Sequence, residues 1–228
     1  MNVPLRRRTE RDADALVDAL LKLERDTGFL PSQDELTVAF GISRSRIREA
    51  VCELIARRVV EVRPKTGTRV TDERDWQLID QRVVRWRLER DTDPAFPAQL
   101  ATVLRLVEPQ AAADTARCGD PSLLTEIEYA CARRLMANTQ PAYAWARHAL
   151  HVAILTASDN PVLRQMTCFV ASGDGSSSRH MPAPHVSDGE RDVLIQLVAA
   201  IRAGDAAAAR IRMTELNEWD LPLEGGSV

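Results

Sequence analysis

The apolar positions of the chain follow two different periods, and these divide it into two parts. Before about residue 60 they recur at helical spacing, and over residues 59–71 they alternate with polar positions, as in short strands. From Gln77 onward helical spacing returns and continues almost to the end. The pattern predicts a mainly α protein, with an N-terminal domain at 1–75 and an all-helical domain at 76–228.

Three helices are predicted ahead of the strands. Residues 11–25 form one amphipathic stripe, and Ser32 with Glu35 makes an S-x-x-E capping box, in which each side chain satisfies a backbone N–H of the other residue. This second helix should end at Gly41, and Ser43 should cap a third. The expected buried stripe of the third helix is Ile47, Val51 and Leu54.

The sequence VVEVRPKTGTRVT, residues 59–71, predicts two short strands joined by a tight turn, with Gly67 supplying a positive φ. Three helices followed by such a hairpin make a winged helix-turn-helix. The second part is interrupted at DTDP, CGDP, NTQP and SDNP, where Asp or Asn precedes a Pro, as at junctions between helices. Residues 172–189 are rich in Gly, Ser and Pro and are predicted to form a long flexible loop.

The net charge of −3 hides a local excess of positive charge. Residues 41–70 contain eight Lys or Arg against three Glu, a balance of +5 that suits an anionic partner. No apolar run approaches the roughly 18 residues of a membrane span. Charges also stand where a signal peptide needs an apolar stretch, so we expect a cytoplasmic protein without membrane contact. The four cysteines lack C-x-x-C spacing and predict neither a zinc ribbon nor a disulfide framework.

The opening turn of the third helix carries the candidate nucleic-acid contacts. In a helix-turn-helix the second helix enters the major groove N-terminus first, so guanidinium groups there reach guanine edges or phosphates. The expected contacts with double-stranded DNA are Ser43, Arg44, Ser45, Arg46 and Arg48 in the helix and Lys65, Thr66 and Gly67 in the wing. The alternative is that these arginines form only a solvated helix face.

LPSQDELTVAFGISRSRIREAV and the closing GTRV resemble the winged helix of the GntR family of bacterial transcription regulators. RLVEPQAAADTA and HVAILTASDNPVL resemble the FCD ligand-binding domain of its FadR-type subfamily. DWQLIDQRVVRWRLE resembles the linker helix of the branch that includes the galactonate regulator. The resemblance implies a homodimer that binds a palindromic operator, most simply as a repressor, and that is released or retained by a small organic acid such as a sugar acid.

The same resemblance implies a divalent-metal site, made by an Asp, a His four residues later and two His on the last helices. His151 occupies the first histidine position, but Arg147 replaces the carboxylate. The other two histidine positions hold Leu194 and Leu216. One imidazole beside a cation does not hold a metal ion, so we expect neither this metal nor another cofactor. The alternative is that His180 and His185 of the predicted loop rebuild a site with His151.

Three residues are candidates for holding the acid: Arg147, His151 and Arg105. Arg147 projects into the pocket if its helix keeps the family orientation, although it could instead form an internal salt bridge with Glu108 or another acid. His151 could equally be a core residue. The family places its effector arginine where this chain has Leu104. Arg105 is about 100° of helix away and could instead be a surface or interhelical ion-pair residue.

Asp34 stands where related regulators often carry an arginine that reads the groove, so we expect a different operator sequence. Two other functions fit the pattern: a helical-bundle protein that binds a small molecule or a metal, and a DNA-binding regulator that has lost effector sensing. No carboxylate pair, nucleophile beside a base or phosphate-binding loop is visible in the sequence. We therefore do not expect an enzyme.

Overall fold

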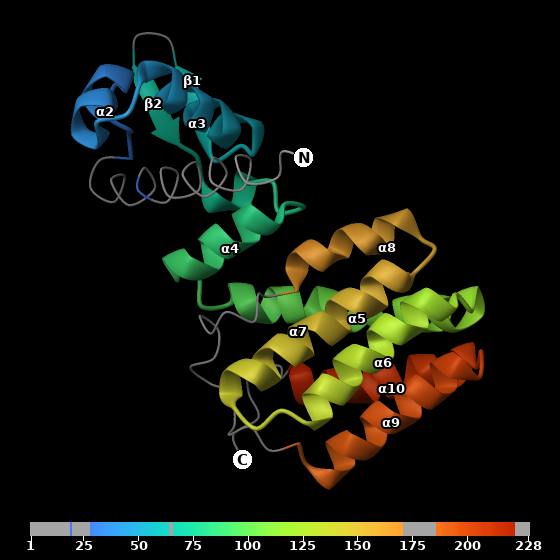
Figure 1. Ribbon diagram of the computed structural model, residues 1–228. Coiled ribbons are helices and arrows are strands. Elements are labelled where there is room, and N and C mark those ends of the chain that lie inside the picture. The colour runs from blue at the N-terminus through green and yellow to red at the C-terminus, as the bar shows by residue number, and fades with distance from the viewer. Residues whose placement is uncertain (1–18, 20–27, 64–65, 171–185, 222–228) are drawn as a thin grey trace, which may run out of the picture. The chain divides into compact units, whose positions relative to one another are not determined.

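The structure of the protein is a computed structural model that describes residue 19 and residues 28–63, 66–170 and 186–221 of the 228. These residues belong to two compact units, which divide between Trp86 and Arg87 (Figure 1). The division lies beyond the boundary expected at Asp75. The helix predicted over 11–25 falls, apart from Ala19, outside the described residues.

Between residue 28 and Asp75, the described part of the first unit contains two helices, a hairpin and a short 3-10 helix. Their bounds are α2 Gln33–Phe40, α3 Arg44–Ala56, β1 Val60–Arg63, β2 Gly67–Val70 and η2 Glu73–Asp75. The predicted capping box is confirmed, since the Ser32 amide donates to Glu35 at 2.7 Å and the Glu35 amide donates to the Ser32 hydroxyl at 3.3 Å. Gly41 ends α2 with a φ of 64°, and Ser43 caps α3. The expected stripe of Ile47, Val51 and Leu54 is buried.

The hairpin forms the predicted wing. Its strands pair antiparallel, with Val60 opposite Val70. Gly67 has a φ of 104°, a conformation that side chains other than glycine rarely adopt, so glycine suits this end of the turn. Phe29 adds a single bridge to Arg69 on the outer side of β2. Helix-turn-helix and wing together confirm the winged fold.

Helix α4 spans Gln81–Arg90 and begins later than the helical pattern from Gln77 indicated. Asp80 accounts for the later start. Its carboxylate accepts a hydrogen bond from the Arg82 amide at 2.9 Å and so caps the N-terminus of the helix. It also accepts a hydrogen bond from the Arg57 guanidinium at 2.8 Å. Three side chains of this region are buried in the core of the first unit, namely Trp76, Val83 and Trp86. Burial of these large apolar groups is the reason that the first unit extends past its expected end.

The second unit is all-helical, as predicted (Figure 1). Its elements are α5 Phe96–Cys118, α6 Pro121–Leu135, α7 Gln140–Ala157, α8 Pro161–Gln165, η3 Met166–Phe169, α9 Asp188–Arg202 and α10 Ala206–Asp220. Helix α5 packs against α7 and α10, and α6 packs against α7 and α9. Asp120 and Asn160 cap α6 and α8 directly before a proline, which confirms two of the predicted breaks. None of the described helices has the length and apolar character that a bilayer span requires.

Helix α9 begins inside the segment predicted as a flexible loop, residues 172–189. The Ser187 hydroxyl accepts a hydrogen bond from the Glu190 amide at 3.1 Å and caps the helix. The end of the predicted loop is therefore the start of α9, a correction that a local serine cap explains. Residues 172–185 of that loop lie outside the described residues.

Candidate functional site

The first turn of α3 presents cations to solvent and apolar residues to the core. The Ser43 hydroxyl accepts a hydrogen bond from the Arg46 amide at 3.4 Å, which satisfies one of the free amides of the helix start. Arg44, Ser45 and Arg48 are exposed, and Arg46 is half-buried. This arrangement meets the requirement for groove entry, because the cations stand clear of the packed face.

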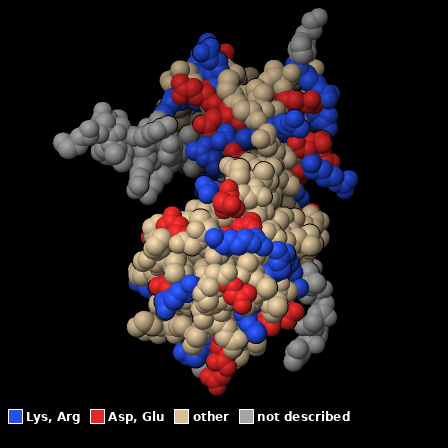
Figure 2. Space-filling model, turned by 90° about the vertical axis from the view of Figure 1, so that its right-hand side faces the viewer, with Lys and Arg blue, Asp and Glu red and all other residues tan. Residues whose placement is uncertain are grey.

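Arg44 already has a partner in the protein. Arg44 Nη2 lies 3.0 Å from Asp34 Oδ1, with side chains that are 74% and 68% exposed. The Ser45 hydroxyl donates to Glu49 at 3.4 Å. Figure 2 shows acidic side chains lying among the Lys and Arg side chains on the face that it presents. Because an exposed ion pair contributes only about 0–1 kcal/mol, a DNA phosphate can displace Asp34 from Arg44.

The wing is described in part. Thr66 and Gly67 are exposed at its tip, whereas Lys65 lies outside the described residues. Arg63 Nη2 pairs with Glu61 Oε1 at 2.7 Å on the first strand. The structure therefore brings two of the three predicted wing contacts to the surface of the unit that also presents the start of α3.

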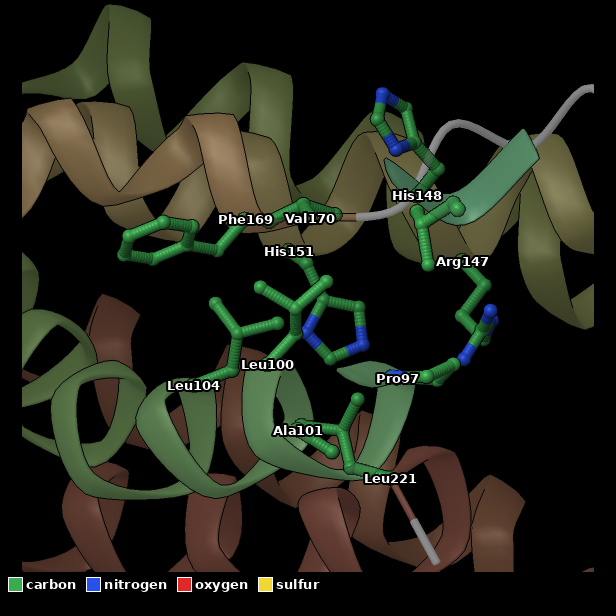
Figure 3. Close-up of a pocket in the computed structure, with 11 residues that line it drawn as sticks. Pro97, Leu100, Ala101, Leu104, Arg147, His148, His151, Phe169, Val170 and Leu221 are labelled. Carbon is green, nitrogen blue, oxygen red and sulfur yellow. The ribbon is translucent and has the colours of Figure 1, made fainter. Parts of the chain in front are cut away.

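A cavity of about 110 Å³ lies in the second unit. Its polar lining is Arg147, His148 and His151, all from α7. The rest of the lining is apolar, and its main part is Leu100, Leu104, Phe169, Val170 and Leu221. Figure 3 shows the His151 ring among these apolar side chains and the Arg147 guanidinium toward Pro97 at one end. Two of the three predicted acid-binding residues thus line one cavity.

His151 lies between two carboxylates. Its Nδ1 is 2.8 Å from Glu108 Oε1, and its Nε2 is 2.9 Å from Asp220 Oδ2. Only the imidazolium form donates from both nitrogens. Burial opposes this charge, but Glu108 and Asp220 outweigh burial and raise the pKa of His151 to about 9. His151 is therefore a buried cation at neutral pH, with no nitrogen left for a ligand.

Asp220 continues the contacts to Arg134, whose Nη1 and Nη2 donate to its two oxygens at 2.6 Å each. Burial opposes ionisation of Asp220, but the Arg134 charge and the hydrogen bond from His151 hold the pKa of this carboxyl well below its usual range. Arg134 also donates to Glu190 at 2.6 Å and to the Tyr143 hydroxyl at 3.0 Å. Burial, against the opposing Arg134 charge, raises the pKa of Tyr143 to about 12. The buried charge network comprises Glu108, His151, Asp220, Arg134, Glu190 and Tyr143.

Reasoning from the sequence missed Arg134, Glu190 and Asp220, although a signal exists. Each stands on the buried stripe of its helix. Arg134 comes seven residues after Ile127, and Glu190 comes four before Leu194, so the charged and the apolar side chains share one face. A charged residue on an apolar stripe is buried and must be paired, which predicts a network without naming the partners.

Two arginines contact the C-terminal end of α10. Arg147 Nη1 donates to the Asp220 carbonyl at 2.8 Å. Arg105 donates to the Leu221 carbonyl at 2.8 Å through Nε and to the Asn217 carbonyl at 3.3 Å through Nη2. Cations are favourable at this end of a helix, where free carbonyls concentrate negative charge. Both side chains therefore hold the last turn of α10.

Arg105 is not among the residues that line the cavity, and its neighbour Leu104 lines the cavity instead. This corrects the assignment of Arg105 to the acid-binding residues. The physical reason is the 100° turn between successive helical positions, which directs Arg105 toward α10. Its role is interhelical, through carbonyl groups rather than through an ion pair.

Arg147 makes no ion pair with a carboxylate among the described residues, and Glu108 contacts His151 instead. The structure therefore contains no salt bridge between Arg147 and Glu108. The Arg147 Nε is buried and finds no hydrogen-bond partner in the described part of the chain. Leaving a buried cationic N–H unsatisfied is costly, so this group is suited to an anion in the cavity.

The positions that the resemblance assigns to a divalent metal do not fit one. Arg147 stands at the carboxylate position, and both nitrogens of His151 already face carboxylates. Leu194 and Leu216 are fully buried in the apolar core. The described residues contain no group of three or more His, Cys, Asp and Glu that could hold an ion. His180 and His185, the alternative ligands, lie outside those residues.

Comparison with known proteins decides the family. Residues 13–70 match the bacterial regulatory proteins of the gntR family, and residues 99–218 match the FCD domain. The chain belongs to the gntR family and carries an FCD domain. The first match contains the exposed start of α3, and the second contains Arg147 and His151. The members that it resembles are transcription regulators and not enzymes.

The galactonate operon transcriptional repressor of Escherichia coli (strain K12) is 35% identical over 145 residues, which is 63% of this chain and 63% of the repressor. The structure of Streptococcus agalactiae GntR matches with a TM-score of 0.50 and 21% identity, over 91% of this chain and 98% of that one. Lar, which controls the expression of the Listeria monocytogenes agr system, matches with a TM-score of 0.55 and 18% identity, over 90% and 93%. At these identities the two structures support the fold alone.

Proposed function

We propose that the protein is a DNA-binding transcription regulator, most simply a repressor, that binds a palindromic operator as a homodimer. The observation that carries the proposal is the first turn of α3, where Arg44 and Arg48 stand exposed over a buried apolar stripe within the gntR-family region. Two such helices related by a two-fold axis would enter successive major grooves about 34 Å apart. A bacterial regulator of this kind acts in the cytoplasm, where the chromosome lies.

A small organic acid is the proposed effector. The cavity supports this assignment, because it offers the Arg147 guanidinium within the FCD domain. Helix α4 is the proposed route to the DNA-binding unit, since Trp86 is buried in the first core and Leu88, on the same helix, lines the cavity. A bound acid changes DNA affinity only if it prefers one arrangement of the two winged units.

The test uses a duplex selected from a random pool for binding to the full chain, followed by gel shifts. Arg44→Ala and Arg48→Ala should each cost about 1–3 kcal/mol on the selected duplex, and Lys65→Ala should weaken binding to all sequences and flatten the salt dependence. Asp34→Asn should tighten binding, because it removes a negative charge near phosphates and releases Arg44.

Arg133→Ala is the matched control, since Arg133 is also an exposed helical arginine but lies on α6 of the second unit. It should leave the affinity unchanged. If Arg44→Ala and Arg48→Ala bind the selected duplex as tightly as this control, or if no duplex is selected at all, the proposed function is wrong.

A further inference from the structure

We infer that the effector is a compact monocarboxylic acid with an apolar tail, held by Arg147 without a metal ion, and not a polyhydroxylated sugar acid. The inference rests on the proposed function, because it names the chemistry of the acid that the same cavity would bind. Three features of the cavity lead to it: one oriented guanidinium, walls that apart from His148 are apolar, and a His151 ring whose two nitrogens are already engaged.

The guanidinium of Arg147 is held so that one edge remains for a ligand. Its Nη1 donates to the Asp220 carbonyl at 2.8 Å, which fixes the plane of the group. The opposite edge carries Nε and Nη2, the fork that binds a carboxylate with two parallel hydrogen bonds. Nε is buried and has no partner among the described residues. A carboxylate on this edge would satisfy the orphaned N–H and neutralise the cation.

The charge of the cavity favours a single carboxylate. Among the described residues that line it, Arg147 is the one arginine, and there is no lysine. Both nitrogens of His151 are taken by Glu108 and Asp220, so its ring offers no second anchor. Apart from the His148 imidazole, a second negative charge of a dicarboxylate would meet only apolar groups, where it would lose its hydration with little compensation.

The walls select against hydroxyl groups. Leu100, Leu104, Phe169 and Val170 contribute side chains that neither donate nor accept hydrogen bonds. A sugar acid would turn several hydroxyls toward these groups and lose their hydrogen bonds to water. A branched aliphatic or aromatic tail instead buries apolar surface there. The volume of about 110 Å³ holds only several water-sized groups, which limits the tail to a compact one.

The binding should not require a metal ion. The resemblance implies a metal-ligating carboxylate at the position that Arg147 occupies in this chain. Arg147 instead supplies a permanent positive charge there. The other assigned positions hold leucines in the core. The Arg147 side chain itself therefore provides the positive charge that would bind the acid.

Calorimetry on the full chain tests the class of acid with four probes: 3-methylbutanoate, phenylacetate, galactonate and 3-methylbutanamide. At least one of the two apolar acids should bind. Galactonate and the neutral amide should bind at least tenfold more weakly, and EDTA should change nothing. The inference is overturned if neither apolar acid binds, if galactonate binds as tightly as the better one, if the amide equals 3-methylbutanoate, or if binding disappears with EDTA.

Variants assign the anchor. Arg147→Gln should weaken acid binding at least tenfold, whereas Arg133→Gln, which removes the same charge from the exposed side of α6, should not. Equal binding by the two variants would overturn the inference. If Arg147→Gln does not fold, the acid-to-amide ratio of the wild-type chain still decides whether a carboxylate receptor exists.

Gel shifts on the selected duplex, with and without 3-methylbutanoate, separate this inference from the proposed function. If the chain binds the selected duplex but fails the four-probe series, the inference about the acid is wrong and the proposed DNA-binding function stands. If the chain selects no duplex, the proposed function is wrong, whatever the calorimetry shows.

Discussion

At the scale of single residues, the protein uses its cations in two different environments. Arg44 is exposed, and its pair with Asp34 contributes about 0–1 kcal/mol. Arg134 and His151 are buried, and removing one partner of a buried pair costs about 3–5 kcal/mol, because it leaves the other charge uncompensated. The exposed arginine can therefore exchange its protein partner for a phosphate, whereas the buried cations hold the core.

The charge on His151 makes the stability of the second unit depend on pH. Its pKa in the folded chain is about 9, against 6.5 for an ordinary histidine. A raised pKa contributes stability that is fully present below pH 6.5 and is lost as the pH rises through about 9, and the shift corresponds to roughly 3 kcal/mol. Urea unfolding of wild type and His151→Gln at pH 6, 7.5 and 9 should show the difference in unfolding free energy shrinking as the pH rises. A difference that is constant over this range would contradict a charged His151.

At the scale of elements, the C-terminal end of α10 is held by side chains from three other helices. Its last turn carries Asp220, which receives hydrogen bonds from Arg134 and His151, while Arg105 and Arg147 donate to backbone carbonyls of the same turn and of the cap. The helix has no basic residue of its own in that turn. Cations from α5, α6 and α7 therefore supply what its own sequence lacks.

Replacing Arg105 by glutamine should have a different effect from replacing Arg147 by glutamine. Arg105→Gln should lower the unfolding free energy by about 1–3 kcal/mol, because it removes two charged hydrogen bonds from the end of α10, and it should leave the affinity for the acid unchanged. Thermal unfolding and calorimetry on the same samples measure both quantities. A variant of normal stability that no longer binds the acid would return Arg105 to the effector site.

At the scale of the whole molecule, the two units have separate cores, and one helix has residues in both units. The first core takes Trp86 from α4, and the cavity of the second unit takes Leu88 from the same helix. We propose α4 as the carrier of a signal between the acid and DNA, because both units include residues of this helix. In the proposed homodimer, a change in each protomer would alter the separation of the two α3 helices.

The proposed homodimer predicts how DNA affinity depends on the spacing of the two half-sites of the operator. Inserting five base pairs at the centre of the selected palindrome turns one half-site by about half a turn and should lower the affinity at least tenfold, whereas inserting ten should restore part of it. Gel shifts on the three duplexes measure this. Equal affinity for the palindrome and for an isolated half-site would contradict binding as a symmetric pair.

The features that the sequence predicted well depend on neighbouring residues. The capping box of Ser32 and Glu35 and the serine cap of α3 join residues three apart, so the local pattern suffices to identify them. The exposed cations of α3 follow from the same local spacing, since the stripe of Ile47 determines which face is buried. The resemblance then supplied the family, which the comparisons confirmed.

By itself, then, the sequence determined most of the described helices, the wing, the cationic turn of α3 and the family, because each depends on short-range spacing or on a contiguous motif. Only the tertiary structure decided the partners of the buried charges, since Glu108 and His151 are 43 residues apart and Arg134 and Asp220 are 86 apart. It also decided that Leu104 and not Arg105 lines the cavity, and that Trp86 belongs to the first core. These contacts depend on how whole helices pack, and no local pattern contains that information.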